Sequence, residues 1–92
     1  MNLQNRVCLV TGSNVRVGKT IALTLSEKGA KVVIHYRSQK ITAEETADLI
    51  RAKGKDCLLV QGDISVRADW MRMRDKIVEK WNKIDVLSHT VF

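Results

Sequence analysis

The sequence predicts an α/β fold in which helices cover both faces of a parallel four-stranded sheet. Two observations lead to this prediction. Short apolar runs of strand type alternate with longer segments of helical pattern, in the order β-α-β-α-β-α-β. The first apolar run is continuous, as in strands that are buried on both faces. Right-handed crossovers between parallel strands restrict the topology, and the expected strand order is 3-2-1-4.

The first 36 residues are expected to hold two strands and one helix. Residues 6–11 form the first strand, around the apolar run 7–10. The first helix is expected over 17–28, and Gly29 suits the position that follows a helix end. Residues 31–36 form the second strand.

The middle of the chain predicts a second helix and a third strand. Thr42 followed three residues later by Glu45 has the pattern of a capping box, in which each side chain bonds a backbone N–H group at the helix start. The helix then runs to Lys53, with Gly54 beyond it. Residues 57–61 form the third strand.

A third helix and a fourth strand complete the predicted sheet. Ser65 is expected to cap the helix, which ends near 82–83, and residues 84–87 form the strand. Apolar residues recur every three or four positions along the helix, which predicts one face packed on the sheet. These residues are Val66, Trp70, Met73, Ile77 and Trp81.

Composition limits the classes of function. A chain of 92 residues makes one small domain at most, and no stretch reaches the roughly 18 apolar residues of a membrane span. The net charge of +6 fits either a plain basic domain or attraction to a phosphorylated ligand. Lysine and arginine are spread along the chain without interleaved aromatic residues, so nucleic acid is not an expected partner.

The two cysteines are expected to be buried free thiols. Cys8 lies within an apolar run and Cys57 opens another, and neither belongs to a metal-ligand pattern. No metal site is therefore expected. Free thiols, together with the lack of a hydrophobic signal segment, favour a cytoplasmic protein.

The stretch from Thr11 to Thr20 predicts a phosphate-binding turn. A strand ends at Thr11-Gly12, a polar loop follows, and Gly18 opens a helix. The free N–H groups and partial positive charge of a helix start attract phosphate. In the predicted sheet this loop lies where the strand order reverses, which is where open α/β sheets bind ligands.

An alternative interpretation is the P-loop of nucleotide triphosphatases, suggested by Gly18-Lys19-Thr20. That motif needs its first glycine at position 13, which is Ser13, whereas Gly12 comes one residue too early. Asp63 does not end an apolar strand, so a magnesium partner is also lacking. The P-loop remains the less favoured alternative.

The pattern Thr11-Gly12-x-x-x-Arg16-x-Gly18 resembles the Thr-Gly-x-x-x-Gly-x-Gly fingerprint of the short-chain dehydrogenase/reductase family. Matching features follow at 35–38 (His-Tyr-Arg-Ser), 62–64 (Gly-Asp-Ile) and 83–87 (Lys-Ile-Asp-Val-Leu). The resemblance implies the amino-terminal half of a doubly wound, Rossmann-like fold. Residues 1–87 would then form a cofactor-binding half-domain, and 88–92 a divergent, truncated tail.

The resemblance implies NADP(H) as the cofactor. Family members that prefer NAD usually carry an acidic residue where this chain has Tyr36, and no carboxylate is expected nearby. Arg37 would pair with the 2′-phosphate of the adenosine ribose, Ser38 would donate a hydrogen bond to it, and Arg16 would approach from the facing loop. Arginine at position 16 resembles the pteridine-reductase-like branch of the family.

The family's adenine contacts imply that Asp63 accepts a hydrogen bond from the adenine amino group and that the Ile64 backbone completes the contact. Ser13 and Asn14 would bond near the adenosine and pyrophosphate, whereas His35 could instead be structural. The residues implied for cofactor binding are Gly12, Ser13, Asn14, Arg16, Val17, Gly18, His35, Tyr36, Arg37, Ser38, Asp63 and Ile64.

The implied activity is hydride transfer between NADPH and a carbonyl or alcohol substrate. The family's catalytic serine, tyrosine and lysine come from its second half, and Tyr36 with Lys40 fits that pattern only numerically, so no catalytic residue is assigned. The alternatives are a stand-alone nucleotide-binding module and a non-functional reductase remnant. Self-association is expected through the edge of the fourth strand.

Overall fold

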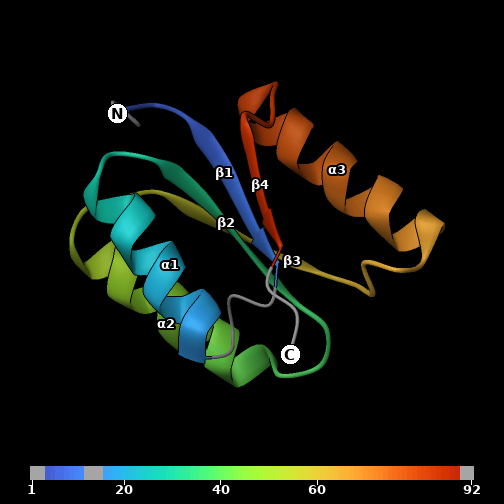
Figure 1. The fold of residues 1–92 in the computed structure, drawn as a ribbon, viewed down its shortest axis with the longest axis horizontal. Helices are drawn as coiled ribbons and strands as arrows, with labels where there is room; N and C mark the ends of the chain where they lie inside the picture. The colour runs from blue at the N-terminus through green and yellow to red at the C-terminus, as the bar shows by residue number, and fades with distance from the viewer. Residues whose placement is uncertain (1–3, 12–15, 90–92) are drawn as a thin grey trace.

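A parallel sheet lies between two layers of helices in the computed structural model, which describes residues 4–11 and 16–89 (Figure 1). The strands lie in the order β3-β2-β1-β4 and every pair is parallel, so the predicted fold class is confirmed. The elements are β1 (Val7–Thr11), α1 (Arg16–Glu27), β2 (Lys31–Tyr36), α2 (Lys40–Ala52), β3 (Cys57–Gln61), α3 (Arg67–Trp81) and β4 (Val86–His89).

The two helical layers follow from the direction in which the chain crosses the sheet. Helices α1 and α2 each carry the chain one strand further from β1 towards β3, so right-handed crossovers place both on the same face. Helix α3 returns the chain past β1 to β4 and therefore lies on the opposite face (Figure 1). The carboxyl ends of all four strands consequently point to one edge of the sheet.

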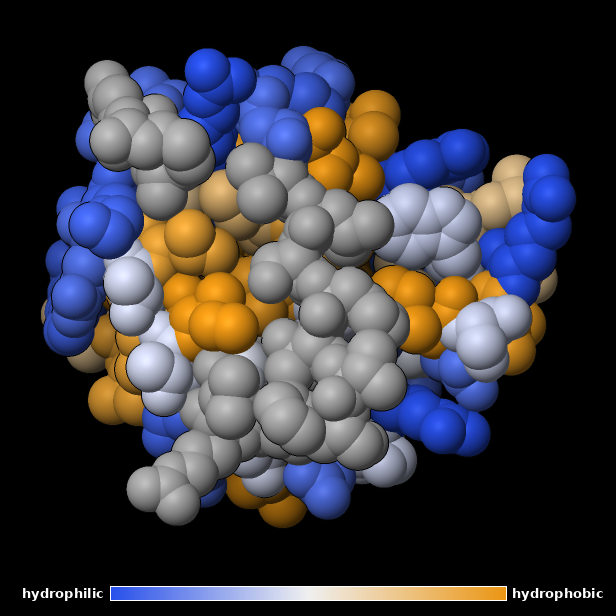
Figure 2. Space-filling view, in the orientation of Figure 1, coloured by the Kyte–Doolittle hydropathy of each residue, from blue (hydrophilic) through white to orange (hydrophobic). Residues whose placement is uncertain are grey.

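Both faces of the sheet are buried, which explains the continuous apolar runs of β1 and β2. Alternate residues of β1 enter different cores: Cys8 and Val10 pack on the side of α1 and α2, whereas Val7 and Leu9 pack on the side of α3. Each of these four side chains is at most 1% exposed. Figure 2 shows that hydrophobic surface also reaches the outside in this view, toward α1 and toward α3.

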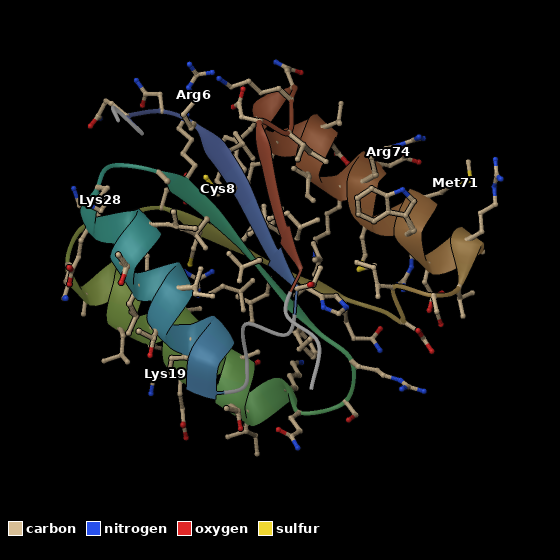
Figure 3. All side chains as sticks on the ribbon, viewed as in Figure 1. Arg6, Cys8, Lys19, Lys28, Met71 and Arg74 are labelled. Carbon is tan, nitrogen blue, oxygen red and sulfur yellow. The ribbon has the colours of Figure 1, made fainter. Side chains whose placement is uncertain are left out.

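The two cysteines are free and buried, as predicted. Cys8 and Cys57 both pair with Val32 across the sheet, so β2 separates them by two strand spacings, about 9–10 Å. A disulfide requires α-carbons closer than about 7 Å, so the two thiols are too far apart to join. Burial raises the pKa of both thiols. Figure 3 shows Cys8 inside the fold, while Lys19 and Arg74 extend outward.

Helix α1 begins and ends one residue earlier than predicted, and Gly29 follows it as expected. Gly29 has a φ of +93°, a conformation that favours glycine. The N–H of Gly29 donates to the Ser26 carbonyl at 3.0 Å, and that of Ala30 donates to the Leu25 carbonyl at 3.1 Å. These bonds satisfy carbonyls that the helix end leaves open.

The predicted capping box at the start of α2 is wrong. The helix begins at Lys40, and its cap residue Gln39 makes no side-chain capping bond. Thr42 therefore lies within the first turn, where its carbonyl accepts a hydrogen bond from the Thr46 hydroxyl at 3.2 Å. A four-residue pattern is a weak signal, and here the helix starts two residues before it.

The predicted cap of α3 is also wrong, although its buried face is largely correct. The cap position is Val66, which makes no side-chain hydrogen bond. Val66 is 44% exposed, so it does not belong to the buried face of the helix. Met73 and Ile77 are buried against the sheet, with Trp70 and Trp81 packed partly buried beside them.

The fourth strand begins at Val86, two residues later than predicted, because Asp85 bonds to Val7 outside the regular strand ladder. The backbone N–H of Asp85 donates to the Val7 carbonyl at 2.9 Å. Its side-chain Oδ2 accepts the Val7 N–H, also at 2.9 Å. The regular ladder to β1 starts only after this reciprocal pair, with Val86 opposite Cys8.

Candidate functional site

The carboxyl ends of β1, β2 and β3 meet the start of α1 at one edge of the sheet (Figure 1). Tyr36 and Gln61, the last residues of β2 and β3, lie opposite each other in the register. The residues that follow them, Arg37 and Gly62-Asp63, are therefore brought together by the parallel pairing. This is the edge at which the sequence predicts a ligand.

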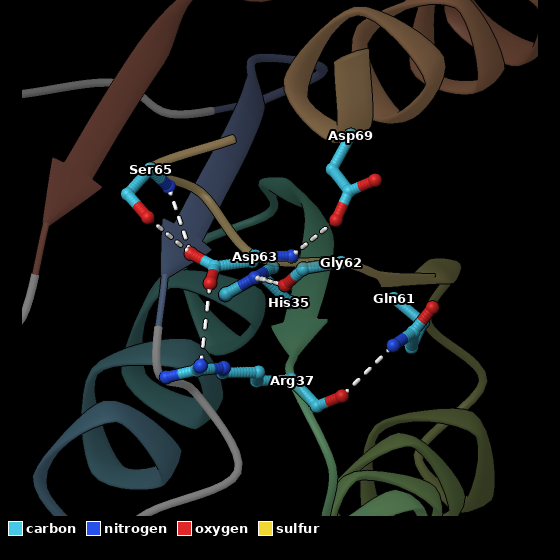
Figure 4. Close-up of polar contacts among 7 residues, drawn as sticks. All are labelled: His35, Arg37, Gln61, Gly62, Asp63, Ser65 and Asp69. Carbon is cyan, nitrogen blue, oxygen red and sulfur yellow. Dashed lines mark hydrogen bonds and ion pairs between the residues drawn. The ribbon is translucent and has the colours of Figure 1, made fainter. Parts of the chain in front are cut away.

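Arg37 and Asp63 form an ion pair that joins the ends of β2 and β3. Nη2 of Arg37 is 3.3 Å from Oδ2 of Asp63 (Figure 4). The arginine side chain is 75% exposed and the aspartate side chain 29%. The expectation that no carboxylate lies near Arg37 is therefore wrong. Adjacent parallel strands bring the two residues together, although 26 positions separate them in the sequence.

Asp63 is held in place by the turn that follows it. Its Oδ1 accepts hydrogen bonds from the backbone N–H of Ser65 at 3.0 Å and from the Ser65 hydroxyl at 2.6 Å. The backbone N–H of Asp63 donates to Oδ2 of Asp69 at 2.9 Å, so the first turn of α3 anchors the loop. The bonds from Ser65, with a smaller contribution from Arg37, lower the pKa of Asp63. Ser65 thus organises the loop instead of capping the helix.

His35 connects the end of β2 to the start of this loop. The residue is 6% exposed, and its Nε2 lies 2.7 Å from the carbonyl oxygen of Gly62 (Figure 4). A carbonyl oxygen can only accept, so Nε2 carries the proton in this bond. The contact fixes the backbone that leads into Asp63.

Two residues that the sequence analysis did not single out support the backbone of Arg37. Nε2 of Gln61 donates to the Arg37 carbonyl at 2.8 Å. Nη2 of Arg72 in turn donates to the Gln61 carbonyl at 2.7 Å, which ties β3 to α3. The sequence predicts that the second and third strands are adjacent. This adjacency places the ends of both strands side by side, and it is the one signal that could have pointed to Gln61 as a support for Arg37.

Other residues of the predicted site are described to different extents. Gly12, Ser13 and Asn14 lie outside the described residues, and Arg16 and Val17 are described only as the first helical residues of α1. The remaining residues of the predicted site lie at the carboxyl edge of the sheet. Gly18 is buried within α1, Tyr36 and Ile64 are half-buried, and Ser38 is exposed.

The arrangement combines an accessible cation with a fixed carboxylate. A guanidinium suits phosphate, which it can bind through two parallel hydrogen bonds, whereas a carboxylate accepts from amino groups. Among residues 4–11 and 16–89, no group of three or more histidine, cysteine, aspartate or glutamate residues is arranged to hold a metal ion. Over the same residues, no helix is long and apolar enough to cross a bilayer.

Comparison with known proteins identifies the family. The model of the short chain dehydrogenases matches residues 6–91, and the chain therefore belongs to that family. The match extends four residues beyond Leu87. The chain is 34% identical to versicolorin reductase stcU of Emericella nidulans, over 94% of this chain and 33% of that protein.

Relatives of different length and a solved structure agree with this assignment. The short-chain dehydrogenase/reductase homolog YusS of Bacillus subtilis is 33% identical over 95% of this chain and 80% of its own length. A Burkholderia cenocepacia protein, assigned as a dehydrogenase and solved with bound NADP, superposes with a TM-score of 0.89 at 35% identity. That match covers 98% of this chain and 35% of the other. The chain thus spans about a third of most of these relatives.

Proposed function

We propose that this chain binds NADP(H) and forms the cofactor-binding part of an oxidoreductase that transfers hydride between NADPH and a carbonyl or alcohol substrate. One observation carries the proposal: the exposed guanidinium of Arg37 stands at the carboxyl end of β2, beside the anchored carboxylate of Asp63. The proposed cofactor-binding unit is residues 1–87. The bound NADP of the Burkholderia cenocepacia relative supports the same assignment.

The residues at this edge suit the adenosine end of the cofactor. Arg37 would bind the 2′-phosphate, with Ser38 and Arg16 as further donors. Asp63 would accept the adenine amino group, and the Ile64 backbone would complete that contact. His35 would act by holding the loop that carries Asp63, because its ring already bonds the Gly62 carbonyl.

The segment between β1 and α1 would hold the pyrophosphate. Backbone N–H groups at a helix start and the positive end of the helix dipole favour an anion there. We assign this role to the glycine-containing segment and to the first residues of α1, and Tyr36 would border the adenosine. These residues are Gly12, Ser13 and Asn14 in the segment and Val17 and Gly18 in α1.

The bound cofactor would supply the hydride, and the residues of this chain would bind and orient it. No catalytic residue is assigned here, since the pattern Tyr36-x-x-x-Lys40 lies at the proposed adenosine end. The substrate remains a carbonyl or alcohol by class. Arg16 supports a place near the pteridine-reductase-like branch.

Calorimetric titration with NADPH and NADH tests the proposal. We expect weak binding of NADPH, little binding of NADH, and loss of NADPH binding in Arg37→Ala. Arg74→Ala is the matched control, because Arg74 is also an exposed arginine paired with an aspartate but lies on α3. Equal binding of both cofactors by the unmodified protein would refute the proposed preference.

A second candidate is a stand-alone nucleotide-binding module without catalysis. The short relative YusS favours it, because this chain spans 80% of that protein. Such a module would bind the cofactor as a well-folded monomer or defined dimer. Cofactor binding by a monomer or a defined dimer, with an affinity that does not rise when catalytic segments of a relative are added, would favour the module over a part of an enzyme.

Two further properties belong to the same proposal. We propose a cytoplasmic location, supported by the two free, buried thiols. We also propose self-association along β4, which among the described residues pairs only with β1. The hydrophobic surface seen toward α1 and α3 in Figure 2 supports a second copy as the partner.

A further inference from the structure

We infer that Asp63 is a specificity-determining residue that competes with the ribose phosphate of the cofactor for Arg37. The inference rests on the proposed function. In the structure, Oδ2 of Asp63 lies 3.3 Å from Nη2 of Arg37, the guanidinium that we assign to the 2′-phosphate. A phosphate that binds Nη2 of Arg37 displaces Asp63 from that nitrogen, whereas a ligand without the phosphate leaves the pair intact.

Asp63 is the fixed member of the pair. Two hydrogen bonds from Ser65 hold its Oδ1, and a third, from its own N–H group to Asp69, holds its backbone. All three bonds can persist when the guanidinium leaves. The carboxylate therefore stays beside the proposed phosphate position and does not follow the arginine.

Arg37 is the mobile member. Its side chain is 75% exposed, and its carbonyl is held by Gln61 at 2.8 Å. A long exposed side chain on a fixed backbone can exchange one anionic partner for another without moving the strand. Phosphate is the stronger partner, because it carries more negative charge and presents three acceptor oxygens.

The exchange of Asp63 for phosphate at Arg37 predicts the direction in which Asp63 changes the cofactor preference. A 2′-phosphorylated ligand has to break the ion pair when it binds, and this cost lowers its affinity. Its unphosphorylated counterpart leaves the pair intact and does not pay this cost. Asp63 therefore restrains the preference that Arg37 creates. Asp63→Asn keeps an oxygen that can accept from Ser65 and removes the charge that competes for Arg37.

Adenosine 2′,5′-bisphosphate and 5′-AMP are suitable probes, because they share the adenine and differ at the ribose phosphate. The measured quantity is the ratio of their dissociation constants in four proteins: unmodified, Asp63→Asn, Arg37→Ala and the double variant. Exposed ion pairs are modest, so we expect Asp63→Asn to increase the preference for the bisphosphate about two- to five-fold. In the Arg37→Ala background, the same substitution should change the ratio much less.

A matched control removes a similar charge elsewhere. Asp56 lies just before β3, at the opposite end of the sheet, and its Oδ1 is 3.8 Å from Nζ of Lys80. Asp56→Asn changes the net charge by the same amount and should leave the ratio unchanged. An equal increase in this control would show general attraction of phosphate to a more positive protein and would overturn the inference.

The outcomes separate the inference from the proposed function. If the unmodified protein prefers the bisphosphate and Asp63→Asn leaves or lowers the ratio, the inference fails and the proposed function stands. An equal effect of Asp63→Asn with and without Arg37 also overturns it. If the unmodified protein binds neither ligand, both fail.

A measurement without ligand tests the pair even if Asp63→Asn does not fold. The carboxyl ¹³C resonance of Asp63 is followed against pH in the unmodified protein and in Arg37→Ala. Loss of the neighbouring positive charge should raise the pKa of Asp63. An unchanged pKa would mean that the ion pair is absent in solution, and the inference would be overturned.

Discussion

Asp85 combines several interactions at the amino end of the sheet, opposite the proposed site. It exchanges two hydrogen bonds of 2.9 Å with Val7 and lies 3.5 Å from Arg6 and 3.1 Å from Lys83. The hydrogen bond from the Val7 N–H, followed by interaction with Lys83, lowers the pKa of Asp85. The charged form of this carboxylate therefore stabilises the junction between β1 and β4.

Asp85→Asn should lower the free energy of unfolding at neutral pH, because the charged acceptor of the Val7 N–H is lost. A carboxylate whose pKa is lowered by folding contributes stability above its unfolded pKa, about 3.9, and loses it as the pH falls through the lower folded value. The difference between the two proteins should therefore shrink below about pH 4. Urea unfolding at several pH values measures it.

Asp48→Asn provides the control, because Asp48 is an exposed carboxylate on α2, away from the junction between β1 and β4. It should match the unmodified protein throughout the titration. A constant difference between Asp85→Asn and the unmodified protein down to pH 2 would contradict the role given to the charge.

Single residues of the candidate site were partly predictable. The resemblance put Arg37 and Asp63 just after the second and third strands, and the structure brings both to one edge. Their ion pair was not predicted, because it depends on the orientations of two side chains 26 positions apart, which spacing along the sequence does not give. The roles of Gln61 and Asp69 depend on side-chain orientations across loops, which no local pattern encodes.

Helix α2 shows how one element is stabilised by its inward face. Ile50 is 1% exposed and belongs to the core between α2 and the sheet, whereas its neighbour Leu49 is 43% exposed. Ile50→Ala should cost about 2–5 kcal/mol of unfolding free energy, since it removes buried methyl groups and leaves a cavity. Urea unfolding followed by circular dichroism measures the loss.

Leu49→Ala is the matched comparison, because it truncates an aliphatic side chain of the same size one position away. It should change the unfolding free energy by no more than about 0.5 kcal/mol. Similar losses for the two variants would mean that α2 presents a different face to the sheet.

Elements were predicted well in type and less well at their ends. Apolar runs and helical periodicity extend over many residues, so each strand and helix was expected near its observed place. Caps depend on one or two side chains that have several possible partners. Thr42 lies inside its helix, and Ser65 bonds Asp63, so both expected caps were wrong.

At the scale of the whole molecule, alternation predicted the parallel sheet, and right-handed crossovers place the helices in two layers for the strand order 3-2-1-4. The same topology leaves β4 at one side of the described sheet. We expect the protein to self-associate there, with a sedimentation coefficient and a melting temperature that rise with concentration. A sharp melt of a monomer that does not depend on concentration would contradict this expectation.

The central claim is that the carboxyl edge of the sheet binds a 2′-phosphorylated dinucleotide. The most direct test is to titrate NADPH into ¹⁵N-labelled protein and map the amide shifts. We predict the largest changes at Arg37, Ser38, Asp63 and Ile64, with little change at Asp56 and Asp85 at the opposite end. Shifts concentrated at that opposite end, or no saturable shifts at all, would contradict the account.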